Sequence, residues 1–355
     1  MREVSWEGWS ATSPDPGRAP GAPSRAPGRR ARAALAGLLL ALLACSPPSQ
    51  PAASPTPEAR FEGYETNEDW QGEAPLVLRG FEGSAMEPRI APDSRTLLFN
   101  DKPASGDRAR QIHQALRDPG DPSGLTWIHQ GEVEGVNAPG ALDGSPALHV
   151  GPDGRGQLWF VSMRAYDGLQ HFGSLWGGDL SFREGRWRMD SPPTPRDGAV
   201  ELEEPGHVDM DVEVTPDGRR LIVSRASFSE RGYPDRSRLT FFSLSPDGRA
   251  LPDPDSDRLL AAVNDPGCRV YAGCLSADGR ELYYSAFRFV HGALPMRILV
   301  SKRDSPRDPF PKGRVIQAVT GARTEAPSLS SDGRTLYFHK QRPDGSLGLY
   351  RVTRR

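Results

Sequence analysis

The sequence predicts an all-β fold of short strands, and two observations lead to this class. Of the 355 residues, 38 are glycine and 35 are proline, while only 36% are hydrophobic. This composition is typical of many turns between short strands rather than of long helices. The chain also repeats one strand–turn–strand pattern five times, which indicates stacked equivalent units. Its length accommodates one large β domain or two average ones.

Five segments carry the repeated pattern, and their central aspartates are 60, 64, 61 and 54 residues apart. The segments are PRIAPDSRTLLFN from Pro88, ALHVGPDGRGQLWFVS from Ala147, VEVTPDGRRLIVS from Val212, AGCLSADGRELYYS from Ala272 and PSLSSDGRTLYFHK from Pro327. The central aspartates are Asp93, Asp153, Asp217, Asp278 and Asp332.

Each segment has the chemistry of a β-hairpin. An apolar residue three positions before the aspartate, such as Ile90 or Leu329, ends a packed strand. In the turn, proline presets φ, aspartate bonds its own backbone and glycine takes the left-handed position. Apolar and polar residues then alternate, as around Leu97 and Phe99, with the period of two that marks a strand.

These segments resemble the WD40-like repeat of TolB-type β-propeller proteins, in which a strand, Ser-Pro-Asp-Gly and a Leu-x-Phe strand follow one another. The resemblance covers roughly residues 84–350 and implies four-stranded blades around a central channel. Five copies predict five blades, with six as the alternative if a degenerate copy hides in residues 100–145 or 225–265. The last blade ends at residues 347–352 without an outermost strand. We expect residues 75–79 to supply it, so that an N-terminal strand closes the ring.

The remaining blade strands are placed between the repeats. Residues 110–115 and 125–129 predict the outer strands of the first blade, and residues 297–300 and 314–318 those of the fourth. Residues 242–248, FSLSPDG, imitate the motif, but ALPDP follows where the Leu-x-Phe strand should be. They therefore predict a turn between the outer strands of the third blade.

The first 44 residues predict an export signal rather than a part of the fold. Arginines within residues 29–32 precede the apolar run Ala33–Ala44. This run is too short for a permanent membrane helix, because about 30 Å of hydrocarbon requires roughly 20 apolar residues. Its end, Leu-Leu-Ala-Cys at residues 42–45, resembles the bacterial lipobox, which implies cleavage before Cys45 and a diacylglycerol on its thiol.

The resemblance to the lipobox implies an exported protein of the cell envelope, anchored by lipid to a membrane and facing the periplasm or the cell surface. Two acyl chains suffice for stable attachment. The alternative is an ordinary secreted protein cut near Ala44. We divide the chain into the extension and signal peptide (1–44), a Pro/Ser-rich tether (45–70) and the propeller domain (71–355).

Polar residues near each repeat are the candidates for a functional site. In a propeller the innermost strands enter from one face, so residues just before each motif gather around one mouth of the channel. The candidates are Glu87, Asp143, His149, His207, Asp209, Asp211 and Glu325, together with Arg164 and Arg225 from the neighbouring strands. Such a rim suits carboxylate or sulfate groups on the arginines, and sugar hydroxyls or a cation on the acids. The alternative is that they are solvated loop charges, because 25% of the chain is charged.

The acids also allow an enzymatic hypothesis. Five-bladed propellers include glycoside hydrolases with three carboxylates around the channel, where a carboxylate pair performs acid–base chemistry. Glu87, Asp143, Asp209 and Glu325 are the residues for this arrangement. No G-x-S-x-G, H-E-x-x-H or P-loop motif occurs, and the sequence predicts no metal and no other cofactor.

Cys268 and Cys274 leave a disulfide open. A fully extended strand would place them roughly 20 Å apart, beyond the limit of about 7 Å for a bridge. A disulfide therefore requires the chain to fold back before Val270, and the alternative is one buried cysteine and one loop thiol.

The expected function is that of a non-enzymatic binding scaffold. The balance of 44 Lys+Arg against 46 Asp+Glu argues against a nucleic-acid partner. The TolB-type resemblance implies assembly with an envelope protein, and the charged rim favours a polar ligand. A carbohydrate-active enzyme is the alternative.

Overall fold

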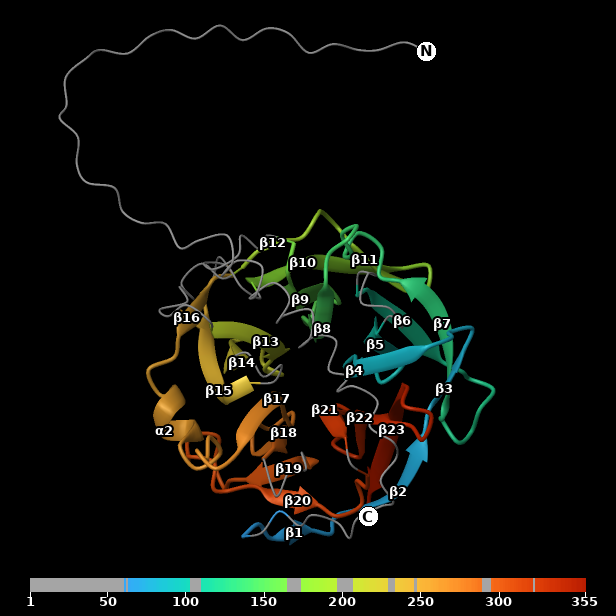
Figure 1. Cartoon of the computed structure of the whole chain (residues 1–355). Helices are drawn as coiled ribbons and strands as arrows, with labels where there is room; N and C mark the ends of the chain where they lie inside the picture. The colour runs from blue at the N-terminus through green and yellow to red at the C-terminus, as the bar shows by residue number, and fades with distance from the viewer. Residues whose placement is uncertain are drawn as a thin grey trace, which may run out of the picture.

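Five sheets stand around one axis as the blades of a β-propeller (Figure 1). The predicted five-bladed all-β fold is confirmed, and the six-bladed alternative is wrong. The predicted signal peptide and Cys45 lie outside the described residues. No helix in the described part of the chain has the length and apolar character to cross a membrane. The computed structural model describes residues 61, 63–102, 110–164, 174–196, 207–228, 234–245, 248–288, 295–321 and 323–355.

The first three blades follow the chain from the axis outward. The first consists of β4 (Ser84–Ile90), β5 (Thr96–Lys102), β6 (Ile112–Arg117) and β7 (Thr126–Glu132). The second has β8 (Asp143–Val150), β9 (Gly156–Ser162), β10 (Ser174–Arg183) and β11 (Arg186–Met189), with β12 (Thr194–Pro195) also on β10. The third has β13 (His207–Val214), β14 (Arg220–Phe228), β15 (Pro234–Leu244) and β16 (Ala250–Pro252). The motif-like segment before β16 joins outer strands, as its sequence predicts.

The last two blades have the same order. The fourth consists of β17 (Arg269–Leu275), β18 (Glu281–Phe287), β19 (Met296–Lys302) and β20 (Arg314–Ile316). The fifth has β21 (Thr324–Leu329), β22 (Thr335–Gln341) and β23 (Leu347–Arg354) from the C-terminal end of the chain. A short helix, α2 (Ser256–Leu260), connects the third and fourth blades.

Residues 66–79, which we call the strap, add outer strands to three blades. β1 (Thr66–Asn67) runs parallel to β20, β2 (Trp70–Pro75) antiparallel to β23, and β3 (Val77–Arg79) parallel to β7. The expectation that residues 75–79 complete the fifth blade is therefore wrong in its bounds. The reason is packing: Trp70 is buried between the fourth and fifth blades, while Leu76 belongs to the cluster between the fifth and first.

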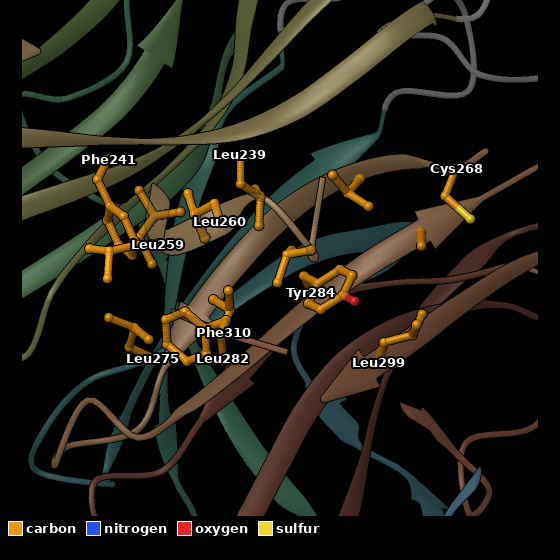
Figure 2. Close-up of a cluster of buried hydrophobic side chains, with 14 of the residues drawn as sticks. Leu239, Phe241, Leu259, Leu260, Cys268, Leu275, Leu282, Tyr284, Leu299 and Phe310 are labelled. Carbon is orange, nitrogen blue, oxygen red and sulfur yellow. The ribbon is translucent and has the colours of Figure 1, made fainter. Parts of the chain in front are cut away.

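Hydrophobic side chains fill the seams between neighbouring blades. Five clusters of buried side chains each join two adjacent sheets, so the core is a ring of five interfaces. Figure 2 shows the seam between the third and fourth blades, where Phe241 of β15 and Leu260 of α2 meet Leu282 and Tyr284 of β18. These seams hold the innermost strands in fixed positions around the axis.

Candidate functional site on the propeller axis

Every innermost strand carries a β-bulge, where its register against the second strand shifts. The shifts lie between Met86 and Arg89, Gly144 and Ala147, Asp209 and Asp211, Tyr271 and Cys274, and Glu325 and Ser328. Four bulges place a non-glycine residue in a left-handed conformation, with φ of 50 to 54° at Glu87, Ser145, Ala272 and Ala326. Because alanine serves in the fourth and fifth blades, the bulge itself requires no polar side chain.

Hydrogen bonds between blades hold these bulges. The backbone N–H of Glu87 donates to His339 Nδ1 (3.2 Å), that of Ser145 to Asn100 Oδ1 (3.2 Å), that of Ala272 to Ser224 Oγ (2.8 Å) and that of Ala326 to Ser285 Oγ (2.9 Å). Each acceptor lies on the second strand of the neighbouring blade. These bonds pair backbone groups that would be costly to bury unpaired, and they fix each bulge against the adjacent blade.

Glu87, Ser145 and Asp211 meet at this level, and Glu325 is close enough for its charge to raise the pKa of Asp211. We call these four residues the axial cluster. Ser145 Oγ lies 2.9 Å from Glu87 Oε2 and 3.0 Å from Asp211 Oδ1, so these two carboxyl oxygens are less than about 6 Å apart. The backbone N–H of Ser145 also donates to Glu87 Oε2 at 2.9 Å. All three acids remain partly exposed.

The axial cluster holds a proton near neutral pH. Ser145 Oγ has one hydrogen, yet Glu87 Oε2, Asp211 Oδ1 and the Met210 carbonyl oxygen all lie within 3.1 Å of it. The hydroxyl can donate only one of these three contacts. If one of the carboxyl groups is protonated, it can donate a second hydrogen bond to Ser145 Oγ. Burial, together with the negative charges of Glu87 and Glu325, raises the pKa of Asp211 to about 7. Below that pH the cluster therefore combines a carboxylic acid with a carboxylate.

Tyr271 and His339 flank Glu325. The Tyr271 hydroxyl donates to Glu325 Oε2 at 2.9 Å, which orients this carboxylate. His339 Nε2 faces the other oxygen, Oε1, at 4.0 Å. The His339 ring is buried, and burial lowers its pKa to about 4. The imidazole is therefore neutral at the pH where Asp211 titrates.

Two arginines bring positive charge close to the cluster. Arg110 Nη1 lies 3.6 Å from Glu87 Oε1. Arg89, two residues beyond Glu87 on β4, forms an ion pair with Glu213 of β13. Burial outweighs the attraction of Arg89 and raises the pKa of Glu213 to about 7. Arg89 and Glu213 thus form a buried ion pair next to the axial cluster, which joins two innermost strands.

The structure brings three predicted candidates together, Glu87, Asp211 and Glu325. Four others form ion pairs inside their own blades. Arg164 Nη2 lies 2.8 Å from Asp143 Oδ2, and Arg225 Nε lies 3.1 Å from Asp209 Oδ1. A ligand anion at Arg164 or Arg225 would therefore compete with a carboxylate of the protein.

The two candidate histidines lie elsewhere or are not described. His149 packs against Gly218 in the motif turn of the third blade, where an added β-carbon would be 2.6 Å from His149 Nε2. Burial lowers the pKa of His149. His207 is the first residue of β13, and its side chain lies outside the described residues.

Cys268 and Cys274 are free, buried thiols. Cys274 points into the seam between the fourth and fifth blades, whereas Cys268 Sγ lies 3.2 Å from the Tyr64 hydroxyl. β17 continues as a strand from Arg269 to Leu275, so the chain does not fold back as a disulfide would require.

Ser145, Tyr271 and His339 were not among the predicted site residues. For His339 the sequence does contain a signal. Four repeats carry a polar residue seven positions after the motif aspartate, in an otherwise apolar strand: Asn100, Ser224, Ser285 and His339. All four are buried. Buried polar groups are almost always hydrogen-bonded, so a regularly placed one indicates a repeated structural contact.

The axial cluster presents carboxyl oxygens as acceptors, with Arg110 and His339 as neighbouring donors. Within the described ranges, no group of three or more His, Cys, Asp or Glu side chains is arranged to hold a metal ion. The chemistry available from these side chains is hydrogen bonding and proton transfer.

No protein-family model matches the chain, and no curated protein matches it. Similar solved structures include TolB from Acinetobacter baumannii, with 16% identity and a TM-score of 0.38 over 76% of this chain and 55% of TolB, so the match spans little more than half of that protein. A mannose phosphorylase from Leishmania mexicana has 12% identity and a TM-score of 0.47 over 81% of this chain and 88% of the other. An endo-arabinase from Bacteroides thetaiotaomicron has 15% identity and a TM-score of 0.48, over 79% of this chain and 97% of the other.

Proposed function

We propose that this chain is an exported, lipid-anchored β-propeller of the cell envelope that binds a polar ligand at the axial cluster. The observation that carries the proposal is the occupation of two bulge positions by Glu87 and Ser145, where other blades have alanine. Ser145 joins Glu87 to Asp211 at a partly exposed place, and the charge of Glu325 acts on Asp211 there. Polar side chains that converge where the bulge itself does not require them favour a binding site.

A polar ligand fits the described surface better than a protein partner does. The buried centre of a protein interface is apolar and rich in aromatic residues. Among the described residues, the large hydrophobic side chains that are exposed are Val77, Phe182 and Leu251, and they lie in three different blades. Carboxyl oxygens instead accept hydrogen bonds from the hydroxyl or amino groups of a small molecule.

Carbohydrate cleavage is the second candidate, and the acid pair Glu87 and Asp211 favours it. Their oxygens are less than about 6 Å apart, which is compatible with the roughly 5–5.5 Å between the carboxyl groups of retaining glycosidases. Asp211, with its pKa near 7, would be the general acid, and Glu87 the carboxylate. Asp143 and Asp209, which the sequence also nominated, have arginine partners instead.

Ligand screening of the full chain tests the proposal. The probes are neutral sugars and polyols, amino acids and divalent cations, and the measurement is the shift of the thermal unfolding midpoint. We expect one class to stabilise the wild-type protein and the control Asp257→Asn, which alters a carboxylate that is 89% exposed on its side chain. The same class should not stabilise Glu87→Gln or Asp211→Asn.

One outcome distinguishes ligand binding from carbohydrate cleavage, and another excludes both functions for the axial cluster. If a glycan that binds also releases new reducing ends, and Asp211→Asn abolishes the release, the enzymatic candidate replaces simple binding. If no probe class stabilises the wild type, or if Glu87→Gln binds as well as the wild type, the axial cluster is not a ligand site.

A further inference from the structure

His339 is the buried side chain whose polar atom faces the axial cluster without a hydrogen-bond partner among the described residues. The residue is 2% exposed. Its Nδ1 accepts the backbone N–H of Glu87 at 3.2 Å, while Nε2 has only Glu325 Oε1 nearby, at 4.0 Å. The ring is buried as a whole, but Nε2 itself is not fully enclosed and can be reached from the axial cluster. An accessible nitrogen directed at a carboxylate indicates a position where a ligand atom fits.

The hydrogen bond at Nδ1 fixes the tautomer of His339. A backbone N–H can only donate, so Nδ1 carries a lone pair. The neutral ring then carries its hydrogen on Nε2. Burial lowers the pKa of His339 to about 4, which keeps the ring neutral over the physiological range. Nε2 is thus a permanent hydrogen-bond donor and cannot coordinate a cation.

We propose that the axial site takes a neutral, polyhydroxylated ligand such as a polyol or monosaccharide, and that His339 is the donor that selects it. The inference rests on the proposed function and names its ligand class. A hydroxyl group accepts one hydrogen bond and donates another, which is what the gap between His339 Nε2 and Glu325 Oε1 requires. Tyr271 holds Glu325 in place for this contact.

The distances across the gap agree with a bridging hydroxyl. An oxygen about 2.9 Å from the nitrogen and about 2.7 Å from the carboxylate oxygen spans the 4.0 Å separation with roughly a right angle at the hydroxyl. Further hydroxyls of the same molecule meet Glu87 and Asp211. When Asp211 is protonated, Glu87 accepts a hydrogen bond from the ligand and Asp211 donates one.

The charges around the site argue against an anionic ligand and against a cationic one. An anion would face three carboxyl groups, Glu87, Asp211 and Glu325. A cation would face the Nε2–H of His339 and the guanidinium of Arg110, which lies 3.6 Å from Glu87 Oε1. A proton on Asp211 removes one of the negative charges that a cation would need. A neutral hydroxylated molecule satisfies donors and acceptors alike.

Two substitutions of His339 separate its two nitrogens. His339→Asn keeps an acceptor near the position of Nδ1 for the Glu87 N–H but has nothing at the position of Nε2. His339→Gln keeps a donor near Nε2 but loses the acceptor for Glu87. Titration calorimetry of the full chain with mannitol, glucose and galactose, and separately with Ca²⁺ and putrescine, measures the affinities.

We expect at least one neutral probe to bind the wild type, and His339→Asn to weaken it at least tenfold while unfolding at nearly the wild-type temperature. His339→Gln should keep the affinity within a few-fold but unfold at a lower temperature. Nitrogen-15 NMR of the wild-type imidazole should show hydrogen on Nε2 and a lone pair on Nδ1. The opposite tautomer would overturn the inference.

The failure of this inference differs from the failure of the proposed function. If Ca²⁺ or putrescine binds in a Glu87-dependent way and the neutral probes do not, the axial site stands but the ligand class is wrong. If a neutral probe binds His339→Asn as tightly as the wild type, His339 is not the selecting donor. If neither neutral nor cationic probes bind, the proposed site fails with the inference.

Discussion

At the scale of single residues, the motif aspartate explains why the five hairpins form. In every copy its Oδ1 accepts the backbone N–H two residues later, at 2.8 to 3.1 Å. The residue directly after the motif aspartate has a left-handed backbone conformation in all five turns. Glycine holds it in four copies, as at Gly333, but the first copy has Ser94 with φ of 54°. A residue with a β-carbon is strained there.

Replacing Ser94 with glycine should therefore stabilise the protein. We expect Ser94→Gly to raise the free energy of unfolding by roughly 1 kcal/mol, because glycine populates the left-handed region without steric cost. The matched control is Gly333→Ser, which should lower it by a similar amount, since an added β-carbon there meets no atom within 4 Å. Urea denaturation measures both. A loss of stability in Ser94→Gly would contradict the backbone explanation.

Asp211 and His339 make the free energy of unfolding depend on pH in opposite directions. The raised pKa of Asp211, about 7, means that the unfolded chain loses this proton first as the pH rises from about 4. Stability from Asp211 is present at low pH and is lost as the pH rises toward 7. The lowered pKa of His339, about 4, has the reverse effect, because stability is lost as the pH falls from about 6.5 toward 4.

Single substitutions should expose each dependence. In Asp211→Asn, unfolding free energies measured from pH 4 to 7 should rise more steeply with pH than in the wild type, because the opposing contribution is gone. In His339→Asn they should rise less steeply, or fall. If both variants follow the wild-type profile, neither group has the shifted pKa that burial and neighbouring charges imply.

At the scale of elements, the strap determines how the N-terminal side of the chain meets the last blades. Its three strands pair with the fourth, fifth and first blades in succession. Trp70 is 1% exposed and packs edge-on against Tyr283, at 5.8 Å between ring centroids. Asp69 and Glu73 add ion pairs with Lys302 and Lys340. Paired edges expose fewer free backbone groups.

Trp70 should therefore be the main contributor of the strap to stability. Trp70→Ala is expected to lower the free energy of unfolding by about 3–5 kcal/mol, as for other buried tryptophans. Val77→Ala, in the same strap but 55% exposed, should change it by about 0.5 kcal/mol or less. Guanidinium unfolding followed by circular dichroism compares the two. Equal effects would mean that the strap is not held by this buried contact.

At the scale of the whole molecule, the propeller has no single central core. Five clusters of buried side chains each join two neighbouring blades. A sixth, smaller cluster, which includes Tyr271, Ala272 and Ala326, lies beside the polar groups of the innermost strands. Phe61, the first described residue, is buried in the seam between the third and fourth blades. Phe61, β1 and Trp70 fall within residues 45–70, so part of the segment predicted as a tether packs into the folded domain.

The proposed membrane anchor is a property of the whole chain, and Cys45→Ser tests it. In a bacterial host that processes lipoproteins, the wild-type protein should fractionate with membranes, and Cys45→Ser should appear in the soluble fraction with an unchanged unfolding temperature. Ser46→Ala is the control for a substitution beside the cysteine. A Cys45→Ser protein that stays with the membranes would exclude lipid attachment at this residue.

The five hairpins follow from the sequence alone, because turn chemistry and the period-two strand pattern are local. It also placed Glu87, Asp211 and Glu325 among the candidates, since each lies on an innermost strand next to a motif. The outer strand of the last blade was misplaced by a few residues, because Trp70 and Leu76 find their partners in distant blades.

Which acids meet and which are neutralised depends on the folded arrangement of the strands. Asp143 and Asp209 look like the axial acids in sequence, but each pairs with an arginine of its own blade. Ser145 and His339 belong to the site because bulges and seams bring separate blades together. Hairpin formation depends on residues next to each other in the chain. The ion pairs of Asp143 and Asp209 depend on how two strands of one blade align, and the axial cluster depends on contacts between different blades.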